Sequence, residues 1–227
     1  MNITAIIPTA WKKPDLTRNL IHSIVHDVHD VILVDNSHGV YDNSIFECLS
    51  ITDNRGFNWS RVNNFGASYA SDSTDTFLFM NDDLEIIDPN WLRELVAAFD
   101  DPEVGVASAC VELPNGSVPG PAAKLDRGAY SGVCGTGVIP DTIAEVPTIG
   151  GACFAVRRDV YQQVGGFDER FQITHSDTAF GLEAAKYGKV VLVPSSKIRH
   201  YERSSRGSDI PQDTRLFRHL YFGEPLA

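Results

Sequence analysis

The chain has 227 residues, of which 43% are hydrophobic, and its formal net charge is −11. This length and apolar content suffice for one compact domain with its own core, and they exclude a chain that is disordered throughout. The negative charge disfavours unspecific binding to long nucleic acids, because the phosphate backbone is also negative.

The cysteines and apolar segments narrow the class of protein further. Cys48, Cys110, Cys134 and Cys153 are widely spaced without a CxxC pair, so a zinc knuckle is not expected. Buried, reduced thiols in a cytoplasmic protein are the simplest interpretation. No apolar run approaches the ~20 residues that cross a bilayer, so no integral membrane segment is expected. Residues 1–9 resemble a first strand and lack the basic start of a signal segment.

The chain begins with an alternation of apolar strands and a helix. Residues 3–8 and 31–34 are short runs rich in β-branched residues, which is typical of buried strands. Between them, Leu16, Leu20 and Ile24 recur at helical spacing and mark the inner face of a helix. A strand, a helix and a second strand in this order form a βαβ unit, which predicts a parallel sheet.

The rest of the chain continues this pattern around one irregular stretch. The helices expected are at residues 60–70, 88–99, 158–164 and 177–187, and the strands at 77–80, 104–111, 148–156 and 190–193. Gly66 weakens the first of these helices. Residues 112–146 are rich in Pro and Gly without periodicity, which indicates a long excursion, and in a compact domain such a segment is usually functional or mobile. The polar residues from Tyr201 onward are expected to form a tail.

Polar residues gather where the predicted strands end. Asp35 follows the second strand, and Asn81, Asp82 and Asp83 follow the third. In open α/β sheets, ligands bind outside the carboxyl ends of the strands. Two carboxylates there suit Mg²⁺ or Mn²⁺ held against a diphosphate. A helix cap or a solvated turn is the alternative interpretation of such an acidic pair.

Later segments carry three further signals. Gly151, in a Gly-Gly pair before a strand, allows close backbone approach to a ligand or tight packing. Asp177, near His175, is a candidate general base. His200 follows the last strand, where it can ligate a metal or bind a phosphate. Each of these residues also has an ordinary structural explanation when it is taken alone.

Together and in this order, these segments resemble the family 2 glycosyltransferases. The segments that carry the resemblance are Ile6-Ile7-Pro8-Thr9, Val34-Asp35-Asn36-Ser37, Asn54-Arg55-Gly56-Phe57, Asn81-Asp82-Asp83, Gly150-Gly151 with Arg157-Arg158, Gly165-Gly166-Phe167-Asp168 and Ile198-Arg199-His200. The resemblance implies a GT-A fold, a Rossmann-like and mostly parallel sheet flanked by helices. It implies a single domain over residues 1–207, with a nucleotide-binding half at about 1–105, an acceptor half at about 106–207, and a C-terminal tail at 208–227.

The resemblance also implies roles for individual residues. The positions that match nucleotide-sugar-binding residues are Pro8, Thr9, Asp35, Asn54, Arg55, Asn81, Asp82, Gly151, Arg203 and Arg206. Asn81 and Asp83 occupy the outer positions of the family's DxD motif. Asp83 and His200 would bind the Mn²⁺ or Mg²⁺ cofactor. Asp177 matches the second acid of a Glu-Asp pair, which supplies the catalytic base.

Two positions depart from the family pattern. Ser176 stands where the pair has its first acid, and Asn81 stands where the DxD motif has its first aspartate. An amide still offers an oxygen to a metal, but it carries less charge. His175 is therefore a second candidate for the base. A non-catalytic protein that binds a nucleotide sugar is an alternative function.

The activity implied by the resemblance is the inverting transfer of a sugar from a nucleotide diphosphate, UDP- or TDP-linked, to an acceptor hydroxyl. A saccharide is the expected acceptor. A protein side chain or a modified nucleic-acid base is an alternative, and the charge disfavours the latter. A sugar-phosphate nucleotidyltransferase has a glycine-rich loop after the first strand, where this chain has Pro8-Thr9-Ala10-Trp11 without glycine, so this class of enzyme is disfavoured. A dinucleotide oxidoreductase has GxGxxG between the first strand and helix, and this chain lacks that motif there.

Overall fold

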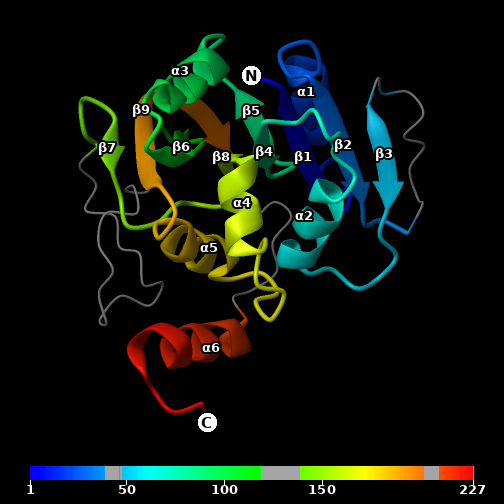
Figure 1. Cartoon of the computed structure of the whole chain (residues 1–227). Helices are drawn as coiled ribbons and strands as arrows, with labels where there is room; N and C mark the ends of the chain where they lie inside the picture. The colour runs from blue at the N-terminus through cyan, green and yellow to red at the C-terminus, as the bar shows by residue number, and fades with distance from the viewer. Residues whose placement is uncertain (39–45, 47, 119–138, 202–209, 227) are drawn as a thin grey trace.

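The computed structural model describes residues 1–38, 46, 48–118, 139–201 and 210–226. Within these residues the chain forms one sheet with helices on both faces (Figure 1). Most of the predicted excursion, together with Cys134, lies outside the described residues. The three other cysteines are free thiols, which agrees with the expectation of reduced cysteines.

The sheet is mixed, and most of its strands share one direction. The strands are β1 (Ile3–Thr9), β2 (Asp30–Asp35), β3 (Leu49–Thr52), β4 (Thr76–Met80), β5 (Leu84–Ile86), β6 (Val104–Glu112), β7 (Ala144–Glu145), β8 (Cys153–Arg157) and β9 (Lys189–His200). Their order is β3-β2-β1-β4-β8-β6-β9-β5, with β7 beside β9. Only β8, β5 and β7 run against the others in the part of the chain described. The predicted α/β class is confirmed.

Helices cover both faces of this sheet (Figure 1). They are α1 (Pro14–Ile24), α2 (Trp59–Ala67), α3 (Trp91–Ala97), α4 (Arg158–Val164), α5 (Ser176–Ala184) and α6 (Pro211–Phe222), with a short 3₁₀ turn η1 (Ala98–Asp100) after α3. Successive side chains of a strand point to opposite faces. Ile7 of β1 therefore packs in the same cluster as Leu20 of α1, and Ile6 packs in the cluster that contains Val62 of α2.

Helix α2 lies very close to the sheet at Gly66. A Cβ atom at this position would lie 2.6 Å from Cγ2 of Ile6 and 2.8 Å from Cγ2 of Val34. The glycine that weakens this helix in the sequence is thus needed for its packing. The helix begins at Asn58, whose side-chain oxygen accepts a hydrogen bond from the backbone N–H of Arg61 at 2.8 Å.

The last strand is longer than predicted. A strand over residues 190–193 is expected to stop at Pro194, but β9 continues to His200. The pairing of β9 with β6 jumps from Val193 to Lys197, so that Pro194 falls in a bulge where no ladder hydrogen bond is needed. Beyond the bulge, His200 pairs with Leu84 of β5, a strand too short to recognise from its sequence.

The predicted tail contains a helix. Pro211 lies in the first turn of α6, and Gly223, with φ of 68°, ends it. Phe217 is buried and packs with Phe171 and with Ala179 of α5. In Figure 1, α6 lies beside α5, away from the sheet. None of the described helices is both long and apolar enough to cross a membrane.

Candidate active site

The carboxyl ends of β1, β2 and β4 bring several predicted site residues to one edge of the sheet. Thr9 and Asp35 are partners in the parallel register of β1 and β2. Asn81 directly follows β4, and its backbone N–H donates to the carbonyl of Ala152 at 2.9 Å. Because β8 runs antiparallel to β4, the residues before β8, including Gly151, reach this same edge.

The acidic residue that ends the Asn81-Asp82-Asp83 run faces a histidine. Oδ1 of Asp83 lies 3.0 Å from Nε2 of His200, and the two side chains are 2% and 13% exposed. The backbone N–H of Tyr201 donates to the carbonyl of Asp83 at 3.0 Å, which holds the two strand ends together. The structure therefore brings together the two residues that the sequence predicts as metal ligands.

This pair fits a divalent cation with an open coordination sphere. A carboxylate oxygen suits Mg²⁺ and Mn²⁺, and the imidazole adds one nitrogen donor. No group of three or more His, Cys, Asp or Glu side chains suited to a metal occurs among the described residues. The protein would thus supply few ligands here, which is the arrangement of sites where substrate phosphates and water complete the coordination.

Asn81 presents its amide nitrogen, and not its oxygen, toward this pair. Its Oδ1 accepts a hydrogen bond from the indole Nε1 of Trp59 at 3.1 Å, and its Nδ2 lies 3.4 Å from Nε2 of His200. An indole N–H only donates, so the atom of Asn81 that faces Trp59 must be the oxygen. In this orientation Asn81 can donate to an anionic group beside Asp83.

Asp82 and Thr9 bind each other within the protein. Oγ1 of Thr9 donates to Oδ2 of Asp82 at 2.7 Å and accepts from the backbone N–H of Trp11 at 2.9 Å. Both residues are buried, with exposed fractions of 1% and 5%. They join the end of β1 to the end of β4 and so shape this edge of the sheet. The neighbouring Pro8 is buried within β1.

Asp177 lies in the first turn of α5 and is anchored to the backbone before β8. Its Oδ2 accepts from the N–H of Gly151 at 2.6 Å, and its Oδ1 accepts from the N–H of Thr178 at 2.8 Å. A Cβ atom at position 151 would lie 2.9 Å from Oδ2 of Asp177. Only glycine at position 151 therefore leaves room for the carboxylate of Asp177. Asp177 is half-buried and lies at the same edge of the sheet as Asn81.

His175, the second candidate for the base, faces the C-terminal helix instead. Its ring stacks on Phe217, with ring centroids 4.6 Å apart and an interplanar angle of 16°. Its Nε2 lies 3.3 Å from Oγ1 of Thr214. Only 4% of the residue is exposed. Of the two candidates, Asp177 is the one held at the sheet edge.

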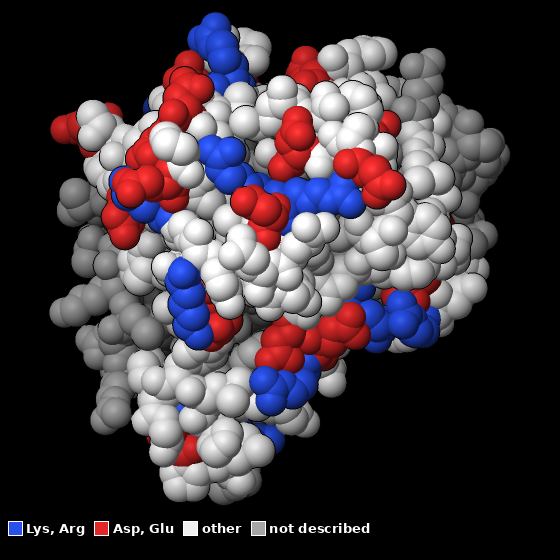
Figure 2. Space-filling view, in the orientation of Figure 1, with Lys and Arg blue, Asp and Glu red and all other residues white. Residues whose placement is uncertain are grey.

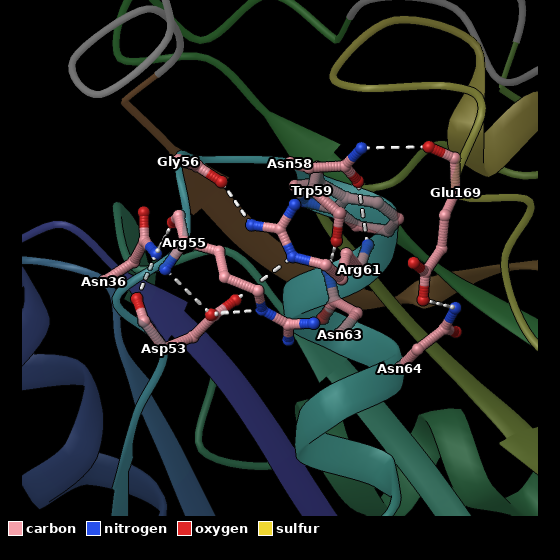
Figure 3. Close-up of polar contacts among 10 residues, drawn as sticks. All are labelled: Asn36, Asp53, Arg55, Gly56, Asn58, Trp59, Arg61, Asn63, Asn64 and Glu169. Atoms are coloured by element: carbon pink, nitrogen blue, oxygen red, sulfur yellow. Dashed lines mark hydrogen bonds and ion pairs between the residues drawn. The ribbon is translucent and has the colours of Figure 1, made fainter.

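A buried aspartate that the sequence analysis did not single out organises the loop after β3 (Figure 3). Oδ1 and Oδ2 of Asp53 lie 2.8 Å from Nε of Arg55 and 3.3 Å from Nε of Arg61, respectively. Burial raises the pKa of Asp53, but the hydrogen bonds from Arg55 and the charges of both arginines outweigh it and hold the pKa below its usual 3.8. The sequence contains a signal for this cluster, because two arginines follow the aspartate at two and eight residues.

This loop lies beside the end of β2. The backbone N–H of Asp53 donates to the carbonyl of Asp35 at 2.9 Å, and Nδ2 of Asn36 donates to the carbonyl of Arg55 at 2.9 Å. The side chains of Asn54 and Arg55 are exposed on the loop. Asp35 is 1% exposed, and its Oδ1 accepts from the N–H of Ser37 at 2.7 Å.

Sequence comparison places the chain in a family. The family described as "Glycosyltransferase like family 2" matches residues 2–218. The chain belongs to the family 2 glycosyltransferases. This confirms the resemblance carried by the motifs. Arg203 and Arg206, which the resemblance assigns to the diphosphate, lie outside the described residues.

Two relatives agree with this family. The chain is 30% identical to the O-antigen biosynthesis protein RfbC of Myxococcus xanthus, over 92% of this chain and 18% of that protein. It is 40% identical to an N-acetylglucosaminyl-diphospho-decaprenol L-rhamnosyltransferase of Mycobacterium tuberculosis, over 27% of this chain and 20% of that protein. This family 2 chain thus spans a fifth or less of these two relatives.

A solved structure shows the same fold. The crystal structure of GalNAc-T7 with UDP, GalNAc and Mn²⁺ superimposes with a TM-score of 0.70 at 16% identity, over 92% of this chain and 46% of that chain. At this identity the likeness concerns the fold, and it confirms the GT-A architecture predicted for this family 2 glycosyltransferase.

Proposed function

We propose that this chain is a metal-dependent, inverting glycosyltransferase that moves a sugar from a nucleotide diphosphate to an acceptor hydroxyl. The observation that carries the proposal is the juxtaposition at one sheet edge of the Asp83–His200 pair, suited to a divalent cation, and the carboxylate of Asp177, suited to a base. Membership of family 2 and the Mn²⁺ and UDP in the GalNAc-T7 structure support it.

The donor would lie across the carboxyl ends of β1 and β2. We propose UDP- or TDP-sugars, with the base and ribose near Pro8, Thr9, Asp35 and the loop of Asn54 and Arg55. The exposed Arg55 guanidinium and the backbone groups of this loop offer hydrogen bonds to a base or a ribose hydroxyl. The diphosphate would then reach Asn81, whose amide nitrogen points toward the Asp83–His200 pair.

Asp83 and His200 would hold Mn²⁺ or Mg²⁺ beside the diphosphate. A cation bound there neutralises the negative charge of the leaving group. Asp177 takes the proton from the acceptor hydroxyl, whose oxygen forms the new bond to the anomeric carbon. The bond from this carbon to the phosphate oxygen breaks on the opposite face, and the diphosphate leaves with the electron pair. Help from a general base is worth roughly 10²–10⁴-fold in rate.

We propose a saccharide as the acceptor. The names of the two relatives, one of O-antigen biosynthesis and one an L-rhamnosyltransferase, support this class. A protein side chain remains an alternative acceptor. Lys and Arg side chains are interspersed with Asp and Glu over the face shown in Figure 2. Such a surface does not favour a nucleic-acid acceptor, for which clustered positive charge is typical.

Calorimetric titration of UDP and TDP, with GDP for comparison, tests the donor site with and without Mn²⁺. We expect UDP or TDP to bind only with the metal. Asp83→Ala should abolish this binding, whereas Asp88→Ala should not, because the carboxylate of Asp88 accepts from the backbone N–H of Asn90 at the start of α3. A folded wild-type protein that binds no nucleotide would refute the proposal.

Turnover separates an enzyme from a binding protein. Asp177→Asn should keep metal-dependent nucleotide binding and lose metal-dependent hydrolysis or transfer of the donor sugar. Wild-type protein that binds the nucleotide sugar and turns over none of it, with saccharide acceptors or with water, would instead identify a non-catalytic binding protein. Ser176, which replaces the first acid of the family's pair, is the sequence feature that favours this alternative.

A further inference from the structure

A buried carboxylate of α6 holds the segment that leads into α5. Asp213 is 1% exposed. Its carboxylate accepts hydrogen bonds from three successive backbone N–H groups, those of Gln172 at 3.0 and 3.1 Å, Ile173 at 2.9 Å and Thr174 at 2.9 Å. A buried carboxylate is costly unless it is hydrogen-bonded, so these contacts bind α6 firmly to this one segment.

The next residue of the segment is also held by α6. His175 has a φ of 64°, in the left-handed region that residues other than glycine seldom adopt. The stacking of its ring on Phe217 and its contact with Thr214 keep it there. His175 is the N-cap of α5, so its conformation sets the direction in which the helix starts.

Helix α2 holds the same segment from its other side. The backbone N–H of Trp59 donates to the carbonyl of Gln172 at 2.6 Å, and Nδ2 of Asn58 donates to the carbonyl of Glu169 at 2.9 Å. Figure 3 shows the Asn58–Glu169 contact at the start of α2. The peptide groups flanking Gln172 thus connect Asp213 to Trp59, whose indole contacts Asn81.

We propose that Asp213 is a positioning residue for the base. It fixes residues 172–175 between α6 and α2, and α5 then begins where the carboxylate of Asp177 meets the N–H of Gly151. This inference rests on the proposed function, because it assigns Asp213 to the turnover step. Asp213 acts through the segment and touches no reacting atom.

The test compares Asp213→Asn with Asp213→Glu and with Leu95→Ala. Asparagine keeps the shape of the side chain but replaces the carboxylate, which accepts from three N–H groups, by a neutral amide. Glutamate restores a carboxylate. Leu95 is fully buried in α3 on the far face of the sheet, so Leu95→Ala controls for a general loss of stability. Thermal denaturation of each variant shows whether Leu95→Ala loses as much stability as Asp213→Asn.

Two measurements distinguish positioning from simple stabilisation. Amide hydrogen exchange of the backbone N–H of Gly151 reports the contact with Asp177 without any substrate. We expect it to accelerate in Asp213→Asn and not in Leu95→Ala. We expect kcat to fall by roughly 10–100-fold in Asp213→Asn, because a misplacement of ~1 Å costs about 10²-fold. The Kd for UDP with Mn²⁺ and the donor KM should stay within about twofold of wild type, and Asp213→Glu should recover part of kcat.

An unchanged Gly151 exchange rate, or a kcat that falls no more than in Leu95→Ala, would overturn the inference. If Asp213→Asn does not fold, Phe217→Leu, which removes the ring stacked on His175, should give the same pattern on a smaller scale. Wild-type protein that binds no nucleotide would overturn the proposed function instead. The exchange rate of the Gly151 N–H would still decide whether Asp213 positions Asp177.

Discussion

Replacing Gly151 by alanine should impair turnover without impairing nucleotide binding. A Cβ atom at this position would lie 2.9 Å from both Cβ and Oδ2 of Asp177. Carbon atoms in favourable contact are about 3.5–4.0 Å apart, so the carboxylate must move away by roughly 0.6–1 Å. The backbone conformation at Gly151 is not left-handed, so alanine introduces no strain of its own.

The size of the effect follows from this displacement. A reacting group misplaced by ~1 Å costs about 10²-fold in rate. Complete loss of general-base help would cost roughly 10²–10⁴-fold. We therefore expect the kcat of Gly151→Ala to fall by about 10–100-fold. The added methyl group should lower the free energy of unfolding by about 1 kcal/mol, at the low end for overpacking, because Gly151 is only half-buried.

The neighbouring glycine provides a matched control. A Cβ atom at Gly150 would have no atom within 4 Å, and its φ is not positive. Gly150→Ala should therefore behave as wild type. The assay is metal-dependent turnover of the donor sugar, with UDP affinity measured by calorimetry. Equal kcat values for Gly150→Ala and Gly151→Ala would refute the assignment of Asp177 as the base.

Three further predictions concern packing and ionisation. Gly66→Ala should lower the free energy of unfolding, measured in urea, by about 1–3 kcal/mol, because the new methyl group overlaps β1 and β2. Helix propensity alone predicts that the free energy of unfolding increases, and such an increase would contradict this packing. Asp53 has a lowered pKa in the folded state, so its carboxylate stabilises the protein above pH ~4, and this contribution is lost as the pH falls through the folded pKa. The difference in stability between wild type and Asp53→Asn should accordingly shrink in acid, and a constant difference from pH 7 to pH 3 would be evidence against the ion pairs with Arg55 and Arg61. Burial raises the pKa of Cys48 to about 11. Iodoacetamide at pH 8 should therefore label Cys48 far more slowly than an exposed thiol, as measured by peptide mapping. Rapid labelling of the folded protein would show instead that the thiol is accessible and ionised.

Local patterns in the sequence predicted the sheet edge where the site lies. Apolar, β-branched runs identified β1, β2 and β4, and the polar residues that follow them had to meet because parallel strands end at the same edge. Asp35 and Asn81 could be placed there without a structure. The order of the motifs likewise indicated family 2, which the sequence comparison confirms.

Contacts between distant segments could not be predicted in this way. The resemblance assigned His200 and Asp83 to one metal, but the contact between them depends on a bulge at Pro194 and on the three-residue strand β5, and neither has a periodic signal. The ion pairs of Asp53 with Arg61 depend on how closely α2 approaches the sheet, which Gly66 permits.

The sequence by itself therefore determined the fold class, the family and the edge of the sheet that carries the site, because periodicity and strand ends are local properties. The tertiary structure decided which of two neighbouring side chains lies at that edge. In the sequence, Asp177 is the first candidate for the base and His175, two residues earlier, is the second. Packing against Phe217 of α6 turns His175 away, whereas the backbone N–H of Gly151 holds Asp177 at the edge. Both contacts join segments more than twenty residues apart, and only the folded chain brings them together.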